Sequence, residues 1–149
     1  MSPTRRTFLR LIAVASALVA RRSWGLAPPA AALPVEAGAF AKALAEEAGS
    51  GTVADSDAIQ LETPLIAENG AIVPISVETA LAGVRELVIL VERNPTPVAA
   101  RFALDPSLDS YVSLRIKMNE SGDVVALAKT ASGCFAARKR VQVVVGGCG

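Results

Sequence analysis

The chain of 149 residues ends in Gly-Gly-Cys-Gly, so a thiol, that of Cys148, stands next to the C-terminus. Gly146 and Gly147 precede it and Gly149 follows it, and glycine adopts backbone conformations that other residues avoid. Termini of this composition seldom hold one conformation unless something ties them down. We therefore expect residues 146–149 to form a flexible arm that can insert the Cys148 sulfur into the active site of another protein.

The chemistry open to this thiol is limited by what the sequence lacks. The sequence contains no histidine, which excludes Ser-His-Asp and Cys-His catalytic groups and histidine-based zinc and copper sites. It also contains no glycine-rich phosphate loop after a predicted strand, and its carboxylates show no paired pattern typical of hydrolases. We expect no catalytic residue, no metal and no cofactor, and therefore a protein on which other enzymes act.

The N-terminus carries the signature of an exported protein. Residues 4–10, Thr-Arg-Arg-Thr-Phe-Leu-Arg, match the twin-arginine motif, and the apolar residues 11–20 are too few to span the roughly 30 Å hydrocarbon core of a membrane. Small residues at Ala30 and Ala32 are typical of a cleavage site. We expect a twin-arginine signal peptide over residues 1–32, export to the periplasm and no stable membrane anchor.

Removal of residues 1–32 changes the charge of the chain. Five of the fifteen Lys and Arg residues and none of the fourteen acidic residues lie there, so the remainder carries 10 minus 14, a net charge of −4. This balance argues against nucleic acid as a partner. No acid follows Asp123, whereas several basic residues do. Each of these is more often a solvated strand residue, but as a group they are candidates for docking or anion handling: Lys129, Arg138, Lys139 and Arg140.

The rest of the chain predicts one helix and several short strands. Residues 34–48 have an apolar face that includes Phe40, Ala43 and Leu44, and Gly49 follows its end. Turn residues then separate seven strand-like segments, which are 59–67, 72–77, 87–91, 98–104, 112–118, 124–129 and 135–145. The apolar run 87–91 is typical of a central strand, whereas Pro74 indicates an edge strand or a bulge.

Short strands at regular spacing predict that residues 33–145 form an all-β domain. We expect an immunoglobulin-like antiparallel β-sandwich with a short N-terminal helix. This fold argues against a disulfide between the two cysteines. A strand over 135–145 spans about 36 Å, whereas the Cα atoms of a disulfide lie within about 7 Å of each other. We therefore expect Cys148 to be free and Cys134 to be a small half-buried apolar residue.

Three parts of the sequence together resemble the SoxY family of sulfur-carrier proteins. They are the leader, the segment 64–70 (Pro-Leu-Ile-Ala-Glu-Asn-Gly) followed by Val73-Pro74, and the ending Val-x-Val-x-Val-Gly-Gly-Cys-Gly. The resemblance covers essentially the whole chain after the leader, and the ending is its most specific part. Cys134 is not part of the family's carrier motif, and one glycine follows Cys148 where many members have two.

The resemblance implies a function that suits a thiol without catalytic groups. Cys148 would carry covalently bound sulfur intermediates of thiosulfate oxidation and would need no other cofactor. A haem-containing enzyme would conjugate thiosulfate to it, a metal-dependent hydrolase would release sulfate, and a sulfur dehydrogenase would oxidise the remaining sulfur. The carrier would form a heterodimer with a SoxZ-like subunit, for which a sheet edge at Pro74 is a candidate contact.

Two other classes of function remain open. A non-catalytic periplasmic interaction module of immunoglobulin type would explain the fold and the leader, but not the cysteine, and would work without Cys148. A cysteine-dependent enzyme would explain the thiol, but it lacks a histidine to activate it and would turn over substrate alone. A ubiquitin-like carrier is disfavoured because Gly147 is not terminal.

Overall fold

The structure is a computed structural model and describes residues 37–105, 107 and 109–144. The predicted signal peptide, the first residues of the predicted helix and the predicted arm over 146–149 lie outside this part of the chain.

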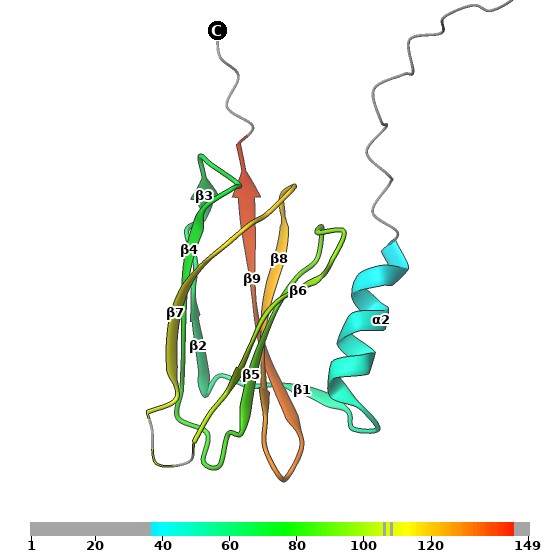
Figure 1. Cartoon of the computed structure of the whole chain (residues 1–149), viewed down its shortest axis with the longest axis vertical. Helices are drawn as coiled ribbons and strands as arrows, with labels where there is room; N and C mark the ends of the chain where they lie inside the picture. The colour runs from blue at the N-terminus through cyan, green and yellow to red at the C-terminus, as the bar shows by residue number, and fades with distance from the viewer. Residues whose placement is uncertain (1–36, 106, 108, 145–149) are drawn as a thin grey trace, which may run out of the picture. The chain divides into compact units, whose positions relative to one another are not determined.

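In the part that the structure describes, nine strands form two sheets (Figure 1). The smaller sheet has the order β2-β4-β7 and the larger one the order β1-β9-β8-β5-β6, with β3 also paired to β9. The predicted β-sandwich is therefore confirmed. The strands are β1 (Val53–Asp55), β2 (Ile59–Glu62), β3 (Ile66–Ala67), β4 (Val73–Thr79), β5 (Glu86–Val91), β6 (Val98–Ala103), β7 (Tyr111–Ile116), β8 (Gly122–Lys129) and β9 (Cys134–Val143).

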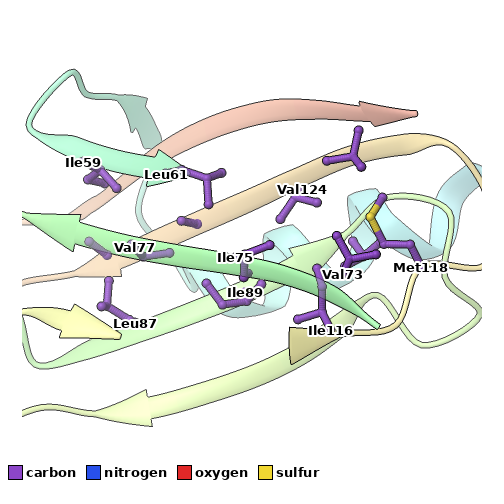
Figure 2. Close-up of a cluster of buried hydrophobic side chains, with 14 of the residues drawn as sticks. Ile59, Leu61, Val73, Ile75, Val77, Leu87, Ile89, Ile116, Met118 and Val124 are labelled. Atoms are coloured by element: carbon purple, nitrogen blue, oxygen red, sulfur yellow. The ribbon is translucent and has the colours of Figure 1, made fainter. Parts of the chain in front are cut away.

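The main core lies between the two sheets. Alternate residues of β4, which are Val73, Ile75 and Val77, point from the smaller sheet toward Leu87 and Ile89 of β5 (Figure 2). All five are buried, and burial of each such side chain contributes about 1.5 to 3 kcal/mol. The alternation of apolar and polar residues along a strand therefore sets which of its faces packs against the other sheet.

A helix covers the opposite face of the larger sheet. Helix α2 (Ala37–Ala48) ends at Gly49, whose φ of 64° is the left-handed conformation that favours glycine after a helix. Its residues Phe40, Ala43 and Leu44 pack against a second cluster, which consists of Val88, Leu90, Val125, Leu127 and Ala136. β5 is thus buried on both faces, which explains why it is a continuous apolar run.

An ion-pair network fastens α2 to the sheet. The carboxylate of Glu47, with a side chain only 8% exposed, binds Arg101 and lies 2.7 Å from Nζ of Lys129, which itself lies 2.9 Å from Glu86. The hydrogen bond from Arg101 lowers the pKa of Glu47, and the bond from Lys129 lowers it further, against the opposing effect of burial. Burial alone would lower the pKa of Lys129, but its bonds to Glu47 and Glu86 raise it. Lys129 therefore joins α2 to the larger sheet, and its docking role stays a prediction.

Two features of the sheets differ from the predictions. β1 and β3 pair with β9 in parallel, so the larger sheet is mixed and not purely antiparallel. Pro74 lies in β4, the central strand of the smaller sheet, and not in an edge strand. β2 pairs with β4 only from Ser76 to Thr79, so β4 has a neighbour on one side only at Pro74. On the side of β4 where β2 does not reach, the missing N–H of Pro74 disrupts no pairing.

Candidate functional site

The last described residues of the chain are held by β3. β9 runs to Val143, and β3 lies beside the end of β9 (Figure 1). The N–H of Gln142 donates to the carbonyl of Leu65, and the N–H of Val144 donates to the carbonyl of Ala67, both at 2.9 Å. The point from which the predicted arm departs is therefore tied to the sandwich by backbone hydrogen bonds.

A serine holds the same strand end from the opposite side. The N–H of Val143 donates to Oγ of Ser121 at 2.8 Å, and this hydroxyl lies 3.3 Å from the carbonyl oxygen of Val143. The backbone pairing of β8 with β9 ends at Gly122 and Val141. The Ser121 hydroxyl therefore bonds to the Val143 backbone where β8 no longer does. Sequence reasoning missed Ser121, which lies between the predicted strands 112–118 and 124–129.

Gly70 fits into a space too small for any side chain. Its carbonyl accepts a 2.7 Å hydrogen bond from the N–H of Met118. A Cβ at this position would lie 2.4 Å from the carbonyl oxygen of Met118 and 2.9 Å from Cγ1 of Val143. Asn69 closes the turn, because its Oδ1 accepts a 2.9 Å bond from the N–H of Ala71. The turn lies between the predicted strands 59–67 and 72–77, and its glycine packs directly against the end of β9.

A buried asparagine fixes the loop that Gly70 contacts. The side-chain amide of Asn94 donates to the carbonyl of Lys117 at 2.7 Å, and its Oδ1 accepts from the N–H of Asn119 at 3.0 Å. Met118 lies between these two residues and is itself buried. The sequence indicated only a chain break at Asn94, because its partners are more than twenty residues away.

These contacts give a structural meaning to the segment that carries the resemblance. Residues 64–74 are distant in sequence from the C-terminus, yet they supply the carbonyls, the close-packed glycine and the turn around the end of β9. The sequence indicated that this segment matters without indicating where it lies. The structure places it at the base of the predicted arm.

The predicted site residues Cys148, Gly146, Gly147 and Gly149 lie outside the described residues. Their distance from the described part is nevertheless bounded by covalent geometry. Cys148 lies four residue steps beyond Val144, and a fully extended chain covers about 3.3 to 3.6 Å per step. The Cα of Cys148 is therefore within about 14 Å of the Cα of Val144.

The basic residues of β9 are exposed, and two of them have acidic partners. Arg138 lies 3.5 Å from Asp55, and Arg140 lies 3.3 Å from Asp123 and 3.8 Å from Glu92. Val141, between the exposed Arg140 and Gln142, is buried. Lys139 is exposed within continuous β8 to β9 pairing.

Lys139 also contributes to a cleft between β2 and β9. The cleft has a volume of about 510 Å³ and is lined mainly by polar residues, among them Asp57, Gln60 and Glu62. Acidic and basic side chains therefore mix along this part of β9. The docking role of Arg138, Lys139 and Arg140 stays a prediction.

Cys134 lies at the opposite end of β9 and is half-buried beneath α2. Its Sγ is 3.8 Å from the carbonyl oxygen of Ala48, and it packs against the cluster beneath the helix. The expectation of a small half-buried apolar residue is confirmed. Nine residue steps along β9 cover about 30 Å, whereas the five steps from Val143 to Cys148 cover at most about 18 Å. The remaining gap of about 12 Å exceeds the 7 Å limit for a disulfide.

The described part of the chain contains no group of three Cys, Asp, Glu or His side chains arranged to hold a metal ion. Among these same residues, no helix is long and apolar enough to cross a membrane.

Comparison with known proteins points to one family. The family model for the sulfur oxidation protein SoxY matches residues 44–148. The solved structure of the sulfur carrier protein SoxY from Chlorobium limicola f thiosulfatophilum is 33% identical, with a TM-score of 0.66 over 73% of this chain and 99% of that chain. No curated protein sequence matches this chain.

Two structures of the superoxide reductase neelaredoxin from Ignicoccus hospitalis, one of them a variant, show similarity of fold alone. Their identities are 21% and 18% and their TM-scores 0.50 and 0.52. They cover 58% and 71% of this chain and 80% and 90% of their own chains. The immunoglobulin-like sandwich is thus shared more widely than the sulfur-carrier function.

The SoxY match differs from these because it includes the residues beyond the sandwich. It extends to residue 148, the cysteine of the predicted arm, and covers most of the chain. The family model and the solved carrier agree with each other and support a role in sulfur oxidation as a carrier. The chain belongs to the SoxY family of sulfur oxidation proteins.

Proposed function

We propose that this protein carries sulfur intermediates covalently on Cys148 and presents them to enzymes on an arm formed by residues 146–149. The observation that carries the proposal is the match to the SoxY family up to residue 148. A second observation supports it, namely the hydrogen-bonded end of β9 at Val144. A firm base lets a short arm enter a partner's active site while the sandwich stays outside.

The chemistry requires only a nucleophilic sulfur on this chain. In the first step, the Cys148 thiol and the terminal sulfur of thiosulfate form a sulfur–sulfur bond, one proton is released, and two electrons pass to the haem-containing partner enzyme. In the second step, water cleaves the bond between the outer sulfur and the sulfonate group. Sulfate and two protons leave, and a persulfide anion stays on Cys148. A sulfur dehydrogenase would then oxidise the outer sulfur of that persulfide to a sulfonate group, with oxygen atoms from water, release of protons and transfer of the electrons to the dehydrogenase. A second hydrolysis would release this group as sulfate and restore the thiol.

The partner enzymes must also activate the thiol. An ordinary cysteine thiol has a pKa near 8.5, so only a few per cent is thiolate at pH 7. The chain has no histidine to act as a base. The protein is therefore a co-substrate of its partners and not an enzyme.

The setting of this function follows from the leader and the family. Twin-arginine export would deliver the folded protein to the periplasm, where it would form a heterodimer with a SoxZ-like subunit. Arg138, Lys139 and Arg140 would assist docking, because they are exposed on β9 and exposed charges steer association. No nucleic acid and no membrane anchor enter this account.

A reconstituted assay tests the proposal. The mature protein is combined with a SoxZ-like subunit, the haem-containing enzyme, the hydrolase and thiosulfate, and released sulfate is measured. We expect Cys148→Ser to abolish sulfate release and Cys134→Ser, the matched control, to retain it. Full activity of Cys148→Ser would refute the carrier role and favour a non-covalent interaction module.

A further inference from the structure

The large apolar side chains that the described part of the protein exposes are concentrated at one end of the sandwich. Five such residues are exposed, and four of them are Leu65, Ile66, Ile72 and Val144, at 81%, 57%, 56% and 47%. We call these four residues the arm-base patch. Single exposed apolar residues are ordinary, but several together on a soluble domain mark an interaction site.

The arm-base patch belongs to segments that are fixed to one another. Leu65 and Ile66 lie at β3, which pairs with the end of β9 just before Val144. Ile72 follows the Asn69-Gly70 turn, and its N–H donates to the carbonyl of Asn69. Tyr111, the fifth exposed residue, pairs with Glu78 at the far end of β4. It therefore offers a control at the opposite end of the molecule.

The position of the patch relative to Cys148 restricts what can cover it. The chain beyond Val144 is so short that the Cys148 Cα lies within about 14 Å of it. An enzyme that encloses the thiol in its active site must bring its own surface to within that distance of Val144. The surface around the arm base is therefore brought against the enzyme in each transfer step.

The composition of this surface suits an apolar partner. Residues 65–72 contain one charged side chain, that of Glu68, and no charged side chain follows Arg140 in the sequence. We propose that the arm-base patch is the docking surface for the enzymes that process Cys148, which would present an apolar rim around the entrance to their active sites. This inference rests on the proposed carrier function and adds to it the surface that the enzymes contact.

Serine substitutions test the proposal in the mature protein assembled with its SoxZ-like subunit. We expect Leu65→Ser and Ile72→Ser each to lower kcat/KM for thiosulfate conjugation by the haem-containing enzyme, because each removes an apolar anchor from the interface. The double variant should lower it at least about tenfold, which corresponds to about 1.4 kcal/mol. Tyr111→Ser should leave kcat/KM unchanged. Alkylation of Cys148 by iodoacetamide needs no docking and should proceed equally in all variants.

Three results would overturn the proposal. The first is an unchanged kcat/KM in the double variant together with an inactive Cys148→Ser, which would leave the carrier function intact and remove only the docking surface. The second is loss of the heterodimer in the double variant, which would assign the patch to the SoxZ-like subunit. The third is an equal loss in Tyr111→Ser. A Leu65→Met variant, which keeps the apolar surface, should retain wild-type conjugation.

Discussion

The N–H of Val144 donates a 2.9 Å hydrogen bond to the carbonyl oxygen of Ala67 and so joins the last described residue of the chain to a two-residue strand from its first half. The bond continues the parallel pairing of β3 with β9. It explains why a segment around residue 67 belongs to the same family pattern as the C-terminal cysteine. The segment holds the end of β9, from which we propose that Cys148 is presented.

Gly70→Ala should destabilise the protein. The added Cβ would lie 2.4 Å from a backbone oxygen of Met118, which cannot move as a flexible side chain can. We expect the free energy of unfolding to fall by about 1 to 3 kcal/mol, as for other overpacked sites, in urea denaturation. Gly38→Ala is the control, because its Cβ meets nothing within 4 Å in α2. An equally stable Gly70→Ala protein would contradict the close packing.

The glycines of the arm should behave in the opposite way. Gly147→Val changes a residue of the predicted arm, which we expect to lie outside the packed sandwich, and changes away from packed residues alter the free energy of unfolding by less than about 0.5 kcal/mol. The reactions of Cys148 with the partner enzymes should nevertheless slow, because a β-branched residue stiffens the arm and widens it. Unfolding curves and conjugation rates measured on the same preparation check both parts. An early unfolding midpoint or an unchanged rate would count against the proposed arm.

The strands and the helix could be predicted because local periodicity sets them. The alternation in 112–118 and the apolar run 87–91 correspond to β7 and β5, and Gly49 ends the helix as expected. Long-range pairing has no such local signal. Two-residue strands such as β3 have no period to detect, and the parallel pairing of β3 with β9 depends on residues that are far apart in sequence.

Parts of the site were equally hidden from sequence reasoning. Ser121 and Asn94 lie between predicted strands, where no local pattern marked them, although each bonds to a segment more than twenty residues away. Pro74 led to a wrong prediction because proline is uncommon in central strands. β4 is a central strand, but its neighbour β2 pairs with it only from Ser76 to Thr79 and therefore does not reach Pro74. The carrier role of Cys148 stays a prediction, and it could be made from the sequence because such a role needs no fold around the thiol.

The stability of the protein should depend on pH through Glu47. Folding lowers the pKa of this carboxyl below its ordinary value of 4.5, so the stabilisation is fully present above about pH 4.5 and is lost as the pH falls through the folded-state pKa. We expect Glu47→Gln to lower the free energy of unfolding by about 1 to 3 kcal/mol at pH 7. The difference from wild type should shrink toward pH 3.

A neighbouring carboxylate on α2 provides the control for this prediction. Glu46 forms an exposed pair with Lys42 at 3.9 Å, and exposed pairs of this kind contribute less than about 1 kcal/mol. Glu46→Gln should therefore leave the pH dependence of urea denaturation nearly unchanged. A Glu47→Gln protein with the same unfolding midpoint as wild type at both pH values would show that α2 is held by its apolar face alone.

Charge reversal on β9 should affect association more than stability. Arg138→Glu with Arg140→Glu removes exposed ion pairs to Asp55 and Asp123, which contribute little to the fold. We expect transfer to the enzymes to weaken most at low ionic strength, where charge steers encounter. Conjugation rates at low and high salt measure this effect. Equal rates for the variant and wild type at low salt would make these arginines ordinary strand residues.

If Cys148 is the covalent attachment site, peptide mass mapping of protein recovered after thiosulfate exposure will show it. We expect mass additions in units of sulfur, with or without a sulfonate group, on the C-terminal peptide that contains Cys148. The peptide that contains Cys134 should carry none, because that thiol is half-buried beneath α2. Sulfur additions on Cys134 with an unmodified Cys148 would contradict the account.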